Sequence, residues 1–211
     1  MNPSAAISFA LFGALAVGDW VAVSRTEKKL EYALKPLALA ALVAASLLLD
    51  PADETRRAFF VAALVLSLAG DVFLMLPRDL FVAGLGSFLL AHVAYIGGFI
   101  HEGVSFVPLV LSFAVVGLAA GPLGIRIVQG ARRADARFVI PVSAYVVVVA
   151  SMGALAVANG SPVAASGALL FLVSDALIGW TRFVRPLLWA PVGIMATYHV
   201  AQSLLVVSLI A

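Results

Sequence analysis

Acidic and imidazole side chains lie deep inside long apolar segments of this 211-residue sequence. They are Asp19, Asp71, His92, Asp175 and His199. An ionised side chain at bilayer depth costs at least about 2.5 kcal/mol, so such residues usually face a bundle interior or a watery cavity. Burial and mutual repulsion let one of two neighbouring carboxyl groups stay protonated while the other is ionised, which suits acid/base catalysis. Asp71 and Asp175 are therefore candidate functional residues.

Neutral polar side chains and one lysine accompany these groups in the apolar segments. Lys35 lies at the inner mouth of the second segment, and tyrosines occur in three later ones. Tyr198 and Gln202 are four residues apart and share a helix face, so with His199 they predict a hydrogen-bonding strip facing a cavity. The candidate substrate-binding residues are Lys35, His92, Tyr95, Tyr145, Tyr198, His199, Gln202 and Asp19.

The composition requires lipid as the surroundings of these segments. Hydrophobic residues make up 64% of the chain and charged residues only 11%, against about 25% charged in soluble domains. Open sheet edges cannot exist in hydrocarbon, and a spanning helix needs about 20 residues. We therefore expect an all-α membrane bundle, a single integral domain over residues 1–211, with about eight spans at 4–23, 33–49, 58–76, 80–100, 104–121, 138–158, 162–181 and 186–210.

Basic residues are distributed unevenly between the two sides of this bundle. Arg56 and Arg57 fall on one side, and the remaining eleven of the 13 Lys and Arg (13 − 2) fall on the other. Because basic loops stay in the cytoplasm, both termini are expected outside. This pattern predicts a multi-pass protein of the cell membrane, the inner membrane if the source is bacterial. The basic loops also attract lipid headgroups, and no nucleic-acid partner is expected.

Residue counting from the basic loops gives the expected depth of the buried groups. Each aspartate precedes the nearest basic loop residue by six or seven positions, which places it roughly 9–10 Å inside the membrane. The two histidines each follow one by fourteen positions, which is roughly 20 Å. An acidic tier and an imidazole tier about 10 Å apart are therefore predicted. This separation disfavours joint metal ligation, so neither a metal nor another cofactor is expected.

The sequence lacks the motifs of several other kinds of catalytic and phosphate-binding site. There is no cysteine, and no Gly-rich phosphate loop, nucleophile elbow or HExxH pattern occurs. Two helical hairpins instead resemble each other. One contains SLAGDVFLML followed by FLLAHVAY, and the other contains FLVSDALIGW followed by GIMATYHVAQS. This similarity indicates an internal repeat of four-helix units, an arrangement known in transporters.

The same segments carry a family resemblance. Lys35-Pro36, SLAGDVFLMLP (67–77), GLGSFLLAHVAYIGGF (84–99), Pro141 with Tyr145, GALLFLVSDALIG (167–179) and ATYHVAQSLLVVSL (196–209) resemble the YhhN-like family of membrane proteins. That family includes lysoplasmalogenases, which cleave the vinyl ether of lysoplasmalogens to a fatty aldehyde and a glycerophospho-alcohol. The resemblance implies an ether hydrolase that acts on a lysophospholipid or ether lipid, although a shared fold need not bring the same substrate.

The chemistry implied by this resemblance fits two aspartates. Protonation of the β-carbon gives an oxocarbenium-like cation, water adds at the α-carbon, and the hemiacetal collapses. A carboxylic acid and a carboxylate suffice, as in glycosidases. Asp71 and Asp175 would share these roles in either order, and Lys35 and the cytoplasmic arginines would meet the phosphate.

Two other functional classes are compatible with the sequence. One is a proton-coupled transporter or lipid permease, which the repeat and the membrane-embedded carboxyl groups would suit. The other is a metal-dependent intramembrane lipid hydrolase that uses the histidines with an aspartate. The lipid substrate and the oligomeric state stay open.

Overall fold

The computed structural model describes residues 2–210 and consists of α-helices joined by short connections. Within this range the helices are α1 (Pro3–Ser24), α2 (Lys28–Leu48), α3 (Glu54–Met75), α4 (Phe81–Glu102), α5 (Phe106–Ala134), α6 (Val139–Ala158), α7 (Pro162–Phe183) and α8 (Ala190–Val207), with a 3₁₀ turn η1 (Ala136–Phe138) before α6. All eight are long and apolar enough to cross a membrane. The predicted all-α bundle of eight spans is confirmed.

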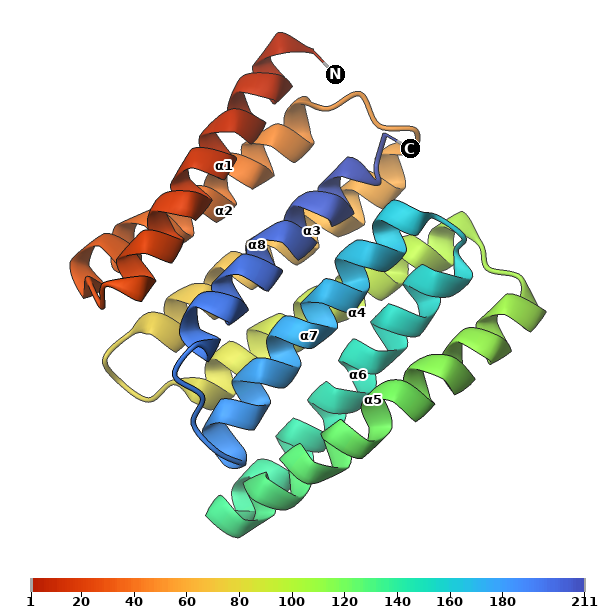
Figure 1. Cartoon of the computed structure of the whole chain (residues 1–211). Coiled ribbons are helices and arrows are strands. Elements are labelled where there is room, and N and C mark those ends of the chain that lie inside the picture. The colour runs from red at the N-terminus through yellow and green to blue at the C-terminus, as the bar shows by residue number, and fades with distance from the viewer. Residues whose placement is uncertain (1, 211) are drawn as a thin grey trace.

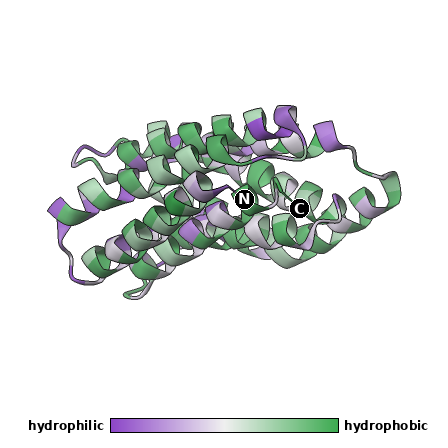
Figure 2. Cartoon of the chain, turned by 90° about the horizontal axis from the view of Figure 1, so that it is seen from above, coloured by the Kyte–Doolittle hydropathy of each residue, from purple (hydrophilic) through white to green (hydrophobic). Residues whose placement is uncertain are grey.

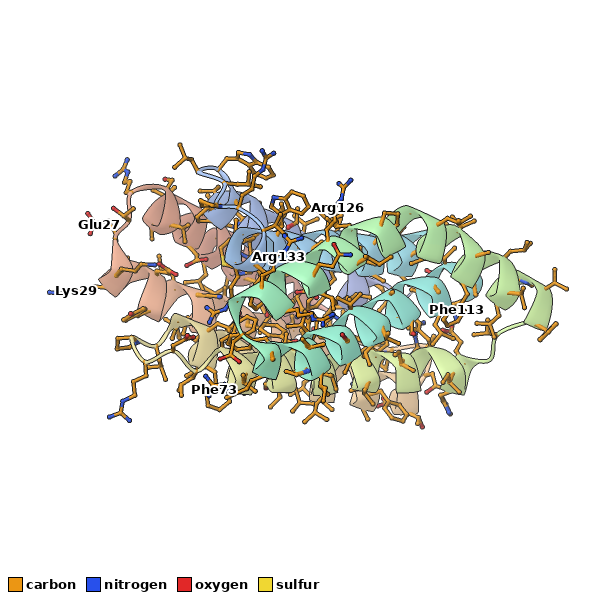
Figure 3. All side chains as sticks on the ribbon, turned by 90° about the horizontal axis from the view of Figure 1, so that it is seen from below. Glu27, Lys29, Phe73, Phe113, Arg126 and Arg133 are labelled. Atoms are coloured by element: carbon orange, nitrogen blue, oxygen red, sulfur yellow. The ribbon has the colours of Figure 1, made fainter. Side chains whose placement is uncertain are left out.

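The helices run side by side, and consecutive helices alternate in direction (Figure 1). Residues near both termini lie at one end of the bundle, together with the α2–α3, α4–α5 and α6–α7 connections. The other four connections lie at the opposite end, called here the basic end, from which Glu27 and Lys29 project in Figure 3. Along their lengths the helices are coloured mainly hydrophobic in Figure 2. The alternation therefore places the basic loops together, as predicted.

Local sequence explains why several helices begin where they do. Asn2 precedes Pro3 and its side chain accepts a hydrogen bond from the backbone N–H of Ala5 at 2.8 Å. Ser161 precedes Pro162 in the same way and caps α7. A polar cap followed by proline satisfies a free N–H and fixes the first turn.

Helix α5 is longer than its apolar segment predicted. The sequence indicated a break from Arg126 to Arg137, but α5 continues to Ala134. Its last turns remain helical because Ile127 and Ala131 are buried against Phe183 and its neighbours, while Arg132 and other basic residues are exposed. Loss of hydrophobicity marked the membrane boundary here and not the end of the helix.

Helix α5 also lies at the edge of the bundle (Figure 1). Its contacts are with α6, η1 and α7. The main core, rich in phenylalanine and alanine, draws its buried residues from the other seven helices of the described chain. Helix α5 therefore forms an outer wall beside α6 and α7 and is not part of the packed centre.

Candidate active site

A buried ion pair joins α2 to α3. The Nζ atom of Lys35 lies 2.9 Å from Oδ1 of Asp71, and the hydroxyl of Tyr198 from α8 donates to Oδ2 at 2.7 Å. The Lys35 and Asp71 side chains are 6% and 2% exposed. Both carboxylate oxygens thus have a donor.

A second buried cluster surrounds Asp175 of α7. Its Oδ2 accepts a hydrogen bond from the hydroxyl of Tyr145 in α6 at 2.9 Å. The Nε2 atom of His92 in α4 lies 3.2 Å from the same oxygen. Three helices therefore bring a phenol, an imidazole and a carboxyl group to one point, and Asp71 and Asp175 each have their own set of partners.

The tautomer of His92 follows from its other nitrogen. Nδ1 lies 2.6 Å from the backbone carbonyl of Phe88, four residues earlier in α4. A carbonyl oxygen can only accept, so Nδ1 carries the hydrogen. In a neutral ring Nε2 then carries no hydrogen, and it lies 3.2 Å from the Asp175 oxygen in a close contact that is not aligned as a hydrogen bond.

The contact between His92 and Asp175 overturns the predicted separation of an acidic and an imidazole tier. His92 is eleven residues after the start of α4 and Asp175 eight residues before the end of α7, so their heights above the basic end differ by only about 4–5 Å. Helical side chains also tilt toward the N-terminus of their own helix. Because α4 and α7 are antiparallel, the two side chains tilt toward each other. Counting from loop residues missed both effects.

The predicted hydrogen-bonding strip of Tyr198, His199 and Gln202 on α8 does not face a single cavity, because its side chains bond in two directions. Gln202 accepts a hydrogen bond through Oε1 from the hydroxyl of Tyr95 at 2.5 Å, on the same side as the Tyr198–Asp71 contact. His199 instead accepts through Nδ1 from Nε1 of Trp20 in α1 at 2.9 Å. Trp20 was missing from the sequence candidates. Its position beside Asp19 in the first apolar segment was the available signal.

Asp19 is fully buried, and neither of its oxygens has a hydrogen-bond partner among residues 2–210. The cation that acts on it most strongly is Lys35. Among the described residues Asp19 therefore makes no hydrogen bond to the Asp175 cluster.

Two phenylalanine rings lie between the carboxyl clusters. The ring centroid of Phe171 is 4.6 Å from His92 and 5.4 Å from Tyr198, and Phe88 is 5.9 Å from Tyr198. Phe171 and Phe88 thus pack between the Asp71 and Asp175 sets of partners. The two aspartates occupy adjacent sites separated by aromatic rings.

The two similar hairpins, α3–α4 and α7–α8, exchange partners across the bundle. Asp71 of the first contacts Tyr198 of the second, and Asp175 of the second contacts His92 of the first. Tyr95 and Gln202, each three residues after a histidine, bond to each other. This reciprocal pattern is what a repeat packed face to face would give.

An apolar cavity of about 120 Å³ adjoins Asp175. Helices α4, α5, α6 and α7 form most of its wall, and α3 contributes Leu74. Among the described residues that line it, Tyr145 and Asp175 alone have polar side chains. Asp175 is 9% exposed, whereas His92 is completely buried and does not reach the wall. The carboxyl group is thus the titratable group presented to the cavity.

A polar mouth opens at the basic end beside this cavity. Lys35, Thr181 and Arg182 line the mouth, and it shares three lining residues with the cavity. The shared residues, called here the collar, are Leu74, Phe81 and Ile178. The collar therefore separates the two cations of the mouth from the apolar cavity that contains Asp175 by one layer of side chains.

The guanidinium group of Arg182 is fixed at this mouth. It donates to both carboxylate oxygens of Asp79, at 2.8 and 3.1 Å, and lies over the Phe81 ring at 4.0 Å from its centroid. The hydrogen bond from Arg182 holds the pKa of the exposed Asp79 carboxyl below its usual range. The sequence counted Arg182 only as one of several cytoplasmic arginines.

The donor geometry gives a metal-dependent mechanism little support. Within the described chain no group of three or more His, Cys, Asp or Glu side chains converges on one point. His92 and Asp175 offer one nitrogen and one carboxyl group, whereas catalytic zinc sites use three protein ligands.

Comparison with known proteins gives consistent similarities. A family model described as the YhhN family matches residues 30–209. The chain is 36% identical over 146 residues to the lysoplasmalogenase TMEM86B of Homo sapiens, covering 69% of this chain and 61% of that protein. It is 33% identical over 172 residues to a lysoplasmalogenase of Mycobacterium bovis, covering 79% of this chain and 66% of the relative.

A third relative is the human lysoplasmalogenase TMEM86A, 32% identical over 156 residues, with 69% of this chain and 62% of that protein covered. The chain therefore spans about three fifths to two thirds of the length of these relatives. No solved structure matches it.

Proposed function

The chain belongs to the YhhN family, and we propose that it is a membrane hydrolase that cleaves the vinyl ether bond of lysoplasmalogen-like lipids. The products would be a fatty aldehyde and a glycerophospho-alcohol. Relatives named lysoplasmalogenase support the substrate class. The proposed location is the cell membrane, with the basic end in the cytoplasm.

One observation carries the proposal: the Asp175 carboxyl group, 3.2 Å from Nε2 of His92, lies on the wall of a cavity whose other lining residues, apart from Tyr145, are apolar. A vinyl ether reacts through protonation at carbon, which needs an acid placed beside an apolar group. An apolar cavity suits the alkenyl chain, and the adjoining cationic mouth suits the phosphate.

In the first step, the Asp175 carboxyl gives its proton to the β-carbon of the vinyl ether. The π electrons form the new C–H bond, and positive charge develops on the α-carbon and the ether oxygen. Asp175 is left as a carboxylate beside this cation and stabilises it electrostatically. We assign His92 the role of a positioning residue, because its Nε2 lies 3.2 Å from the Oδ2 atom of Asp175.

In the second step, water adds to the α-carbon and the Asp175 carboxylate takes up the proton that water loses. The bond between the α-carbon and the glycerol oxygen of the hemiacetal then breaks: the hemiacetal hydroxyl loses its proton as the aldehyde C=O forms, and the glycerol oxygen takes up a proton and leaves as the alcohol. Asp175 is protonated again, so a single carboxyl group serves in turn as acid and base. The hydroxyl of Tyr145 holds the Asp175 carboxyl group in its orientation throughout the reaction.

Asp71 has a different task in this scheme. Both of its oxygens are occupied, by Lys35 and by Tyr198, and it does not line the cavity. We assign it the positioning of Lys35 at the mouth, where the ammonium group and Arg182 would meet the lipid phosphate. Asp71 is thus required for activity without transferring the proton.

Mass spectrometry of products from a panel of lipids tests the proposal. Purified protein is given 1-alkenyl, 1-alkyl and 1-acyl lysophospholipids of matched chain length. Release of fatty aldehyde from the alkenyl lipid alone is the expected result. Fatty acid from the acyl lipid, or flux of lipid into liposomes with no product, would instead indicate an esterase or a permease.

A further inference from the structure

The cavity beside Asp175 ends at glycines of the peripheral helix α5. Gly117, Gly121 and Gly124 follow one another at intervals of four and three residues, and all three line the cavity. They lie in the part of α5 between Phe113 and Arg126, which are labelled in Figure 3. Gly117 is exposed and also lines the cavity.

These three glycines are not equivalent. A Cβ atom at Gly124 would lie 2.6 Å from Val146, so Gly124 is needed for packing of α5 against α6. A Cβ atom at Gly117 or Gly121 would meet nothing within 4 Å. The space beside Gly117 and Gly121 is therefore open and is not required by helix packing.

The level of each glycine relative to the acid can be derived from the contacts. Gly124 packs against Val146, the residue after Tyr145, which bonds to Asp175. Helix α5 runs toward the basic end, so Gly121 and Gly117 lie about 4–5 Å and about 10 Å further from the polar mouth. From the basic end inward, the order is therefore the mouth, the collar, Asp175, Gly121 and Gly117.

We propose that this row of glycines forms the channel for the hydrocarbon chain of the lipid, and that Gly117 and Gly121 set which chain lengths are accepted. This inference rests on the proposed function, which places the vinyl ether bond of the lipid at Asp175. With the phosphate at the mouth, the chain must continue away from it along Gly121 and Gly117. The opening at Gly117 lets longer chains extend into the surrounding lipid.

Leucine substitutions test the channel directly, because they fill open space. Gly117→Leu and Gly121→Leu are compared with Gly86→Leu, an exposed glycine of α4 that also has nothing within 4 Å of its Cβ position and does not line the cavity. Each variant is assayed for kcat/KM on 1-alkenyl lysolipids with short, medium and long chains. Replacing glycine in a helix is otherwise favourable.

The expected result is a shift toward shorter chains. Because one methylene in an apolar pocket changes discrimination by about 10–200-fold, we expect the short-to-long ratio of kcat/KM to rise at least about tenfold in Gly117→Leu, and Gly121→Leu to exclude still shorter chains. Gly86→Leu should keep the wild-type profile. Unchanged chain-length profiles in both α5 variants would overturn the channel, even if aldehyde is produced normally.

Photo-crosslinking on the wild-type protein separates this inference from the proposed function. The probe is a saturated 1-alkyl lysophospholipid that carries a diazirine in the middle of its chain. Labelling of α5 around residues 117–121, reduced in Gly121→Leu, supports the channel even if no lipid is hydrolysed. Labelling confined to other helices overturns it, whatever the protein catalyses.

Discussion

Nε2 of His92 lies 3.2 Å from Oδ2 of Asp175, while Nδ1 of the same ring donates to the carbonyl of Phe88. This tautomer leaves Nε2 of His92 without a hydrogen and in close contact with Asp175. Asp71, by contrast, has an ammonium group and a phenol as donors. The two aspartates that look alike in the sequence are therefore placed for different tasks.

Replacement of Asp175 removes the acid. In Asp175→Asn the amide packs in the same space but has no acidic proton, so kcat should fall by about 10²–10⁴-fold. Asp50→Asn, which changes an exposed aspartate in the α2–α3 connection, is the matched control. Steady-state release of aldehyde is the measurement. Near wild-type turnover in a folded Asp175→Asn protein is incompatible with the mechanism.

Substitution of His92 separates positioning from packing. His92→Leu fills the buried space but offers no acceptor, so kcat should fall about a hundredfold or more. KM should change little, because His92 does not line the cavity. His92→Gln should recover part of kcat, since its carbonyl oxygen can accept the carboxyl hydrogen. Equal kcat in the two variants would mean that the imidazole only packs.

The Lys35–Asp71 ion pair should show strong coupling in stability. Lys35→Met leaves a buried carboxylate unpaired, which should cost about 3–5 kcal/mol in the free energy of unfolding. Adding Asp71→Asn should recover much of that loss while activity stays low. Denaturant unfolding in detergent measures both effects. Strictly additive losses would show that the two side chains do not interact.

Arg182 should affect binding of the headgroup more than chemistry. Arg182→Gln is expected to raise KM about tenfold for phosphate-bearing lipids with little change in kcat, because contact with the phosphate persists throughout the reaction. Arg185→Gln is the control, since Arg185 is exposed and lies outside the mouth. A fall in kcat with unchanged KM would contradict this assignment.

The Asp79–Arg182 pair predicts how KM should depend on pH. Because Arg182 lowers the pKa of Asp79, the carboxylate is ionised from neutral pH down to its usual range near 3.9, and the pair is lost only when pH falls through the lowered value. The KM difference between wild type and Asp79→Asn should therefore be constant from about pH 8 to about pH 5. A difference that disappears near pH 6 would show that Asp79 does not hold Arg182.

Much of the fold could be predicted from composition, because lipid leaves only helices as spanning structures and basic loops mark one side. All ten candidate site residues are buried in the bundle. Their grouping was less predictable. Residue counting separated His92 from Asp175, whereas the actual helix ends and the tilt of side chains on antiparallel helices bring them together.

Other parts of the site depended on packing between distant segments. Trp20, the donor to His199, is 179 residues away in the sequence. The cavity arises because small residues of α5 face α6 and α7, and glycines in a membrane helix equally indicate close packing. Only the space around each glycine distinguishes Gly121 from Gly124.

Isotope incorporation tests the central claim most directly. In D₂O, proton transfer from Asp175 to the β-carbon should give a fatty aldehyde with one deuterium on the carbon next to the carbonyl. Mass spectrometry of the aldehyde, rapidly reduced to the alcohol, measures this deuterium. In Asp175→Asn and His92→Leu the rate at which deuterated product forms should fall by the same factor as kcat. Aldehyde without deuterium, or no aldehyde from any 1-alkenyl lysolipid, would contradict carbon protonation by this site.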